Sequence, residues 1–129
     1  MNTIDKNSEN EISVENEISA YDLHKLLTTY FGSVFIKLSD AKFTLPSNAE
    51  VRKNSVFLIR RDWDCDDYAF AAMVPMRNYA FGMMYITTEK GSKHVANLFV
   101  NQNREVVFWD AQKNEIYTGK FHKPELIIF

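Results

Sequence analysis

The sequence predicts an α+β domain in which N-terminal helices pack on an antiparallel β-sheet. An apolar stripe at helical spacing runs from residue 20 to 31, and a capped stretch rich in helix formers follows at 64–73. After Pro75, aromatic and β-branched residues gather in short runs separated by polar turns, which is typical of consecutive antiparallel strands.

Length and composition indicate one domain at 19–129, preceded by a flexible acidic tail at 1–18. No apolar run approaches the ~18 residues of a membrane span, and residues 1–19 lack the basic start and apolar centre of a signal peptide. We therefore expect a cytoplasmic protein without a membrane partner. The absence of an arginine cluster argues against nucleic acid as a partner. The oligomeric state is not predicted.

The first helix is expected from about Ala20 to Phe31. Ser19 followed by Asp22 is a variant of the capping box, and Gly32 is a helix stop. His24 on this helix is interpreted as a solvated histidine. The stretch 33–61 is expected to hold short extended segments, a turn at 46–48 and a buried run at 56–59.

The sheet is expected to be an antiparallel meander, because its runs follow one another with short polar connections. The expected strands are 79–88, 93–100, 105–110, 115–118 and 126–129.

Cys65 is the only cysteine, which excludes an internal disulfide and a multi-cysteine zinc site. It stands in the first turn of a helix that Asp64 is expected to cap, where the helix dipole favours a thiolate. Asp64, Asp66 and Asp67 oppose that thiolate with negative charge, which a protonated histidine or a hard cation such as Ca²⁺ would offset. Alternatively, Cys65 is a small buried apolar residue and the aspartates only cap and solvate the helix.

His94 and Asp110 are expected to lie close together in the sheet. With four turn residues between their strands, Asp110 falls opposite about Val95, beside His94. A carboxylate next to a histidine orients the ring and stabilises its protonated form, as the third member of a catalytic triad does. The alternatives are a structural histidine and an aspartate that serves only the turn.

Two motifs resemble known families. Asp64-Cys65-Asp66-Asp67-Tyr68-Ala69 resembles the Asp-Cys-Glu-Asp-Tyr-Ala motif of the bacterial transglutaminase-like cysteine proteases, within the papain-like/transglutaminase-like superfamily. The pair His94-Val95-Ala96-Asn97 and Asp110-Ala111-Gln112 is also similar to the protease domain of some fungal lectins. The resemblance covers about residues 60 to 112.

The resemblance implies a papain/transglutaminase-like fold with Cys65 as nucleophile, His94 as general base and acid, and Asp110 orienting His94. It also implies Ca²⁺ bound beside the cysteine by Asp64 and Asp67. The function expected from it is a cysteine hydrolase, either a protease or amidase or an acyl transferase, which acts on a protein or peptide through an acyl-enzyme. Neither Asn54 nor Ser55 is selected as oxyanion donor.

Two other readings stay open. One is a catalytically inactive papain-like domain that binds a protein or small-ligand partner, in a phage-borne or conflict-related setting. The small size and the negative charge near the thiol motivate it. The other is a cell-wall amidase of the wider superfamily, against which the missing export signal counts.

Overall fold

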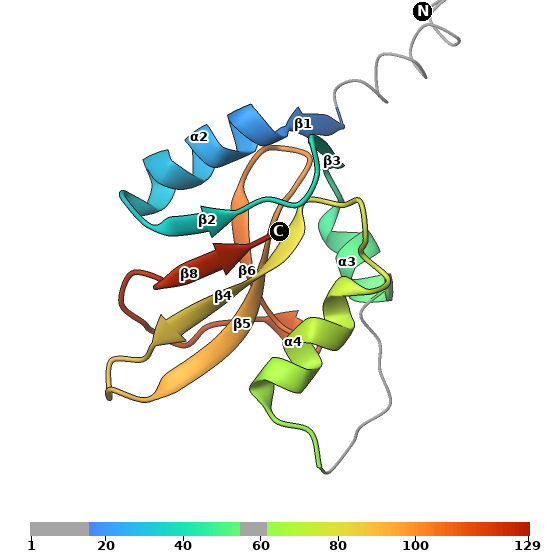
Figure 1. Ribbon diagram of the computed structural model, residues 1–129. Coiled ribbons are helices and arrows are strands. Elements are labelled where there is room, and N and C mark those ends of the chain that lie inside the picture. Colours follow the sequence, from blue (N-terminus) through green and yellow to red (C-terminus); the bar gives the residue numbers. More distant parts are fainter. Residues whose placement is uncertain (1–15, 55–61) are drawn as a thin grey trace, which may run out of the picture.

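The computed structural model describes residues 16–54 and 62–129 as a sheet with helices around it (Figure 1). Residues 1–15 of the expected tail, the expected buried run 56–59 and Ser55 lie outside the described residues, while residues 17 and 18 belong to a strand. The helices are α2 (Ala20–Phe31), α3 (Asn48–Asn54) and α4 (Cys65–Met73). The strands are β1 (Glu17–Ser19), β2 (Phe35–Lys37), β3 (Lys42–Thr44), β4 (Phe81–Thr87), β5 (Lys93–Val100), β6 (Val106–Asp110), β7 (Glu115–Ile116) and β8 (Leu126–Ile128).

The main sheet has six strands in the order β2-β8-β4-β5-β6-β7, and β1 pairs with β3 in a separate ribbon. Strands β4 to β7 form the expected antiparallel meander. The expectation is wrong at the other edge, because β8 returns to pair with β4 and β2 pairs with β8 in parallel. Gly82 allows this return, since a Cβ there would lie 2.2 Å from the carbonyl oxygen of Ile128.

Helix α2 confirms the expected helix. The hydroxyl of Ser19 accepts a hydrogen bond from the backbone N–H of Asp22 at 3.0 Å, and Gly32 ends the helix with φ of 83°. Leu23 and Leu27 are buried one turn apart. They anchor α2 on the sheet through the apolar stripe that the sequence shows.

Helix α3 corrects the turn expected at 46–48, since a helix begins at Asn48. Its capping box is complete: the N–H of Glu50 donates to the hydroxyl of Ser47 at 3.0 Å, and the N–H of Ser47 donates to Oε1 of Glu50 at 2.9 Å. Ser47-Asn48-Ala49-Glu50 is the sequence signature of this cap, so the local signal was present. The phenol of Tyr79 donates to Glu50 at 3.2 Å and ties α3 to the start of β4.

Two apolar clusters occupy opposite faces of the sheet. One holds Leu23 and Leu27 of α2 against Leu98 of β5 and Ile127 of β8. The other holds α3 and α4 against Phe99 of β5, with alternate residues of that strand serving alternate faces. The second cluster fixes α4, and therefore Cys65, over β5 and β6. Its buried members are Val51, Tyr68, Ala72, Met76, Phe81, Phe99, Trp109 and Ala111.

Candidate functional site

Cys65, His94 and Asp110 come together where the first turn of α4 meets β5 and the end of β6. All three are half-buried and line one small cavity of about 10 Å³, with Asn97 and Gln112 among its other walls. A second cavity, of about 320 Å³, shares Cys65 and His94 with the first. We call the two cavities together the Cys65 groove.

The first turn of α4 begins as the sequence predicts. Asp64 is the N-cap, and its Oδ1 accepts from the N–H of Asp67 at 3.4 Å. The side chain of Asp67 accepts in return from the N–H of Asp64 at 3.2 Å, which completes a capping box. The capping role expected of these two carboxylates is therefore confirmed.

Asp66 makes the first turn of α4 an acidic cluster. Ligand oxygens of Asp64, Asp66 and Asp67 lie within 4.8 Å of one another. A side-chain hydrogen bond with Asp64 raises the pKa of Asp66, and the same bond lowers the pKa of Asp64. Three closely spaced carboxylates fit a hard cation such as Ca²⁺, so calcium binding by Asp64 and Asp67 stays a prediction.

The side chains of His94 and Asp110 each interact with other groups. The His94 ring stacks on Tyr117, with ring centroids 5.4 Å apart and planes 22° from parallel. Asp110 Oδ1 accepts from the backbone N–H groups of Gln112 and Lys113 at 3.1 and 3.3 Å, and so holds the turn after β6. In the described part of the chain, no hydrogen bond joins His94 to Asp110. The turn role of Asp110 is confirmed.

The register between β5 and β6 differs by one residue from the expected one. Asn97 pairs with Trp109 and Val100 with Val106. Continued by one residue, this register sets Asp110 beside Ala96 instead of Val95. Since side chains alternate between faces, the one-residue difference moves Asp110 to the same side of the sheet as His94.

Asn97 fastens α4 to the sheet, and sequence reasoning did not select it as a site residue. It is fully buried, and its Nδ2 donates to the carbonyl oxygens of Ala69 in α4 and Gly82 in β4 at 3.1 and 3.0 Å. Its Oδ1 has no hydrogen-bond partner among the described residues. Its place in the His94-Val95-Ala96-Asn97 motif was the available signal.

Tyr117 also escaped sequence reasoning. Burial raises the pKa of its phenol, and negative charge on Asp110 and on Cys65 adds to the rise. The phenol is therefore electrostatically coupled to two of the three predicted site residues. Tyr117 lies in the expected strand 115–118, directly after β7, and nothing in that pattern distinguishes it as a site residue.

The outer part of the groove carries an ion pair. The Lys93 ammonium lies 2.8 Å from Glu125, and both groups bond to the Thr87 hydroxyl. The pKa of Glu125 is lowered most by the hydrogen bond from Lys93 and next by the hydrogen bond from Thr87. Tyr85, Ile86 and Val95 supply apolar wall beside these charges. This part of the groove therefore combines both signs of charge with an aromatic ring.

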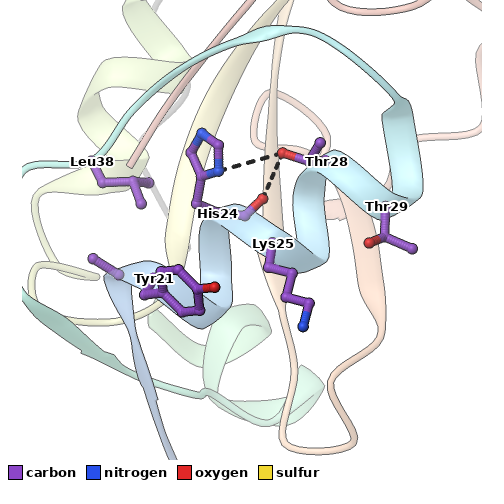
Figure 2. A pocket seen from close by; sticks show the side chains of 7 residues that line it. Tyr21, His24, Lys25, Thr28, Thr29 and Leu38 are labelled. Atoms are coloured by element: carbon purple, nitrogen blue, oxygen red, sulfur yellow. Dashed lines mark hydrogen bonds between the residues drawn. The ribbon is translucent and has the colours of Figure 1, made fainter.

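A larger cavity, of about 770 Å³, lies over α2 (Figure 2). Figure 2 shows that its walls are mostly side chains of this one helix, among them the exposed Tyr21 and Lys25. The Thr28 hydroxyl donates to the carbonyl oxygen of His24 at 2.8 Å and lies 3.4 Å from its ring nitrogen. His24 thus lines a surface hollow, and its hydrogen bonds stay within one helix. We favour the Cys65 groove as the candidate functional site, because three elements converge there.

Fold and site together define a small mixed-sheet domain with helices on both faces and a polar groove at the start of α4. No protein-family model and no curated protein matches the chain. The solved structures to which it is similar include a complex of PSL1a with E64, at 19% identity with a TM-score of 0.65. They also include Polyporus squamosus lectin bound to the human-type influenza-binding epitope Neu5Acα2-6Galβ1-4GlcNAc, at 16% identity with a TM-score of 0.65.

Each comparison covers 88% of this chain and 50% of the lectin chain, so the chain spans about half the length of the proteins it matches. At these identities the likeness shows the fold alone. None of the described helices has the length and apolar composition needed to cross a membrane.

These findings correct three sequence predictions. The structural neighbours are lectin complexes, which replaces the predicted relationship to papain-like/transglutaminase-like cysteine proteases. The papain/transglutaminase-like α+β class gives way to the fold that the chain shares with these structures, in which a mixed sheet dominates and the described residues form three short helices. The predicted cysteine hydrolase with a Cys65–His94–Asp110 triad is likewise corrected, because the solved structures to which the chain is similar are lectin complexes and the Asp110 side chain bonds to its own turn.

Proposed function

We propose that this chain is a ligand-binding domain and that its ligand binds in the Cys65 groove. The observation that carries the proposal is the convergence of Cys65, His94 and the Lys93–Glu125 ion pair on one cavity of about 320 Å³. Cavities of this size with a few polar groups on an apolar wall are typical of small-molecule sites. The sequence-predicted residues Cys65, His94 and Asp110 serve in this proposal as walls of the binding site.

The ligand class that we propose is a glycan. Sugar hydroxyls both donate and accept hydrogen bonds, so they suit a groove that offers carboxylates at Asp66 and Glu125 and donors at Lys93 and His94. The apolar face of a sugar ring suits the half-buried ring of Tyr85. The trisaccharide bound to Polyporus squamosus lectin supports the class without indicating where a glycan would bind here. A cytoplasmic location, expected from residues 1–19, stays a prediction.

The proposal is tested by titrating ¹⁵N-labelled protein with Neu5Acα2-6Galβ1-4GlcNAc and, separately, with E64. We expect saturable shift changes at Cys65, Lys93 and His94, together with heat release in calorimetry. His94→Ala should weaken binding about tenfold, which corresponds to the loss of roughly one hydrogen bond. Tyr21→Ala, in the hollow over α2, is the matched control and should bind as the unmodified chain does.

Two outcomes would count against this function. Shift changes confined to Tyr21 and Lys25 would move the site to α2. Turnover of a generic amide substrate that disappears in Cys65→Ala would show that the domain is an enzyme. The intact mass after E64 treatment and denaturation is an independent measurement. Reversible binding leaves the mass of the chain unchanged, whereas an increased mass would show a covalent reaction and count against a pure binding function.

A further inference from the structure

The inner cavity of the Cys65 groove is lined by Asn97, whose side chain carries a buried acceptor without a donor. Asn97 is 0% exposed, and its Oδ1 has no hydrogen-bond partner among the described residues. The orientation of the amide is determined by its surroundings, because Nδ2 donates to two carbonyl oxygens, those of Ala69 and Gly82. Exchanging the two amide atoms would set an oxygen against both carbonyls, so the unpaired atom is the oxygen.

A buried acceptor of this kind costs free energy unless a donor reaches it. The cavity that Asn97 lines has a volume of about 10 Å³, which is at the lower limit for one water molecule. Its other walls include Cys65, His94, Asp110 and Gln112, all of which carry polar atoms. One molecule in this cavity would therefore find the two to four polar partners that buried water requires.

We propose that this cavity is a subsite for a single hydrogen-bond donor group, which water fills in the free protein and a ligand hydroxyl or N–H fills in the complex. The donor bonds to Asn97 Oδ1 and lies against His94 and Cys65. Occupancy by water follows from the geometry alone. The ligand's part rests on the proposed function, which it deepens by requiring a donor group at the inner end of the ligand.

Asn101 is a matched internal control. It is also buried, but its Oδ1 accepts from the N–H groups of Asn103 and Glu105, both at 3.0 Å. Its Nδ2 donates to Glu105 at 2.9 Å and to Asn48 at 3.3 Å. With both amide atoms satisfied, Asn101 has no need of a water molecule.

The test measures magnetisation transfer between water and the side-chain amide protons of Asn97 and Asn101 in the full chain. We expect a rotating-frame cross-peak of dipolar sign between water and the Asn97 amide, and none for Asn101. A folded protein without the Asn97 cross-peak would overturn the subsite. A crystal structure gives a second reading, since solvent density about 3 Å from Asn97 Oδ1 supports the subsite and an empty cavity refutes it.

Adding Neu5Acα2-6Galβ1-4GlcNAc separates this inference from the proposed function. Loss of the water cross-peak on binding supports the donor role of the ligand. Binding with the cross-peak retained overturns that role. Absence of any binding, with the water cross-peak present, counts against the glycan proposal and leaves the water subsite established.

Discussion

The imidazole of His94 stacks on the phenol ring of Tyr117, with centroids 5.4 Å apart and an interplanar angle of 22°. Tyr117 is itself held in place, because its backbone N–H donates to Phe108 at 3.0 Å and Gly119 passes close to its hydroxyl. A Cβ at Gly119 would lie 2.4 Å from that hydroxyl. The stack therefore positions the His94 ring in the Cys65 groove. The residue that does so, Tyr117, follows β7 and belongs to neither α4 nor β5.

Replacing Tyr117 tests whether the stack positions His94. Tyr117→Phe retains the ring and should leave ligand affinity within about twofold, whereas Tyr117→Leu should weaken it about fivefold, since a stacked aromatic pair is worth about 1 kcal/mol. The His94 ring proton shifts should move in Tyr117→Leu and stay in Tyr117→Phe. Equal His94 spectra for the two variants would contradict a positioning role.

The Tyr117 phenol predicts a loss of stability at alkaline pH. Its pKa in the folded state is raised by burial and by Asp110 and Cys65, so the folded chain keeps the phenol proton above pH 10.0 while the unfolded chain loses it. The unfolded state then binds fewer protons, and the free energy of unfolding falls as pH rises beyond the ordinary phenol pKa. Absorbance titration should give Asp110→Asn a Tyr117 pKa closer to its ordinary value. An unchanged pKa would show that the Asp110 charge has no effect.

Asn97→Ala should destabilise the fold. It removes two buried hydrogen bonds, to Ala69 and Gly82, each worth on the order of 1 kcal/mol, and leaves a cavity as well. We expect the free energy of unfolding to fall by about 2–4 kcal/mol in urea titration. Asn103→Ala at an exposed turn is the comparison and should change stability by less than about 0.5 kcal/mol. A loss below about 1 kcal/mol in Asn97→Ala would mean that α4 is held by apolar packing alone.

Calcium should stabilise the first turn of α4. Ca²⁺ would offset the negative charge of the three closely spaced carboxylates, so we expect the melting temperature to rise with added CaCl₂ and to fall back with a chelator. Asp66→Asn should reduce the rise while keeping the capping box of Asp64 and Asp67. Asp62→Asn, outside the cluster, controls for net charge. An unchanged melting temperature in millimolar CaCl₂ would remove the calcium prediction.

Local structure was largely readable from the sequence. The bounds of α2, the cap of α4 at Asp64, and the strand runs that became β4, β5 and β6 follow from side-chain periodicity and from capping residues, which act over a few neighbours. Helix α3 also has a local signature, in Ser47 and Glu50, but the preceding Pro46 is equally typical of a turn.

Long-range pairing was not readable in the same way. The pairing of β8 with β4, and of β2 in parallel with β8, depends on the close approach of Gly82 to Ile128, which no local pattern encodes. The family resemblance covers about residues 60 to 112 and depends on three short motifs, at 64–69, 94–97 and 110–112. It therefore supported a fold class and a reaction that the structural comparisons correct.

The sequence by itself determined the positions of α2, α4 and the meander, and it selected Cys65, His94 and Asp110 as residues that belong together. Only the tertiary structure decided what surrounds them. The register between β5 and β6 set Asp110 on the side of His94, Tyr117 after β7 stacks on the His94 ring, and Asn97 is a buried tether with an unpaired oxygen. These contacts depend on packing between elements far apart in the chain, and side-chain periodicity along one element carries no information about them.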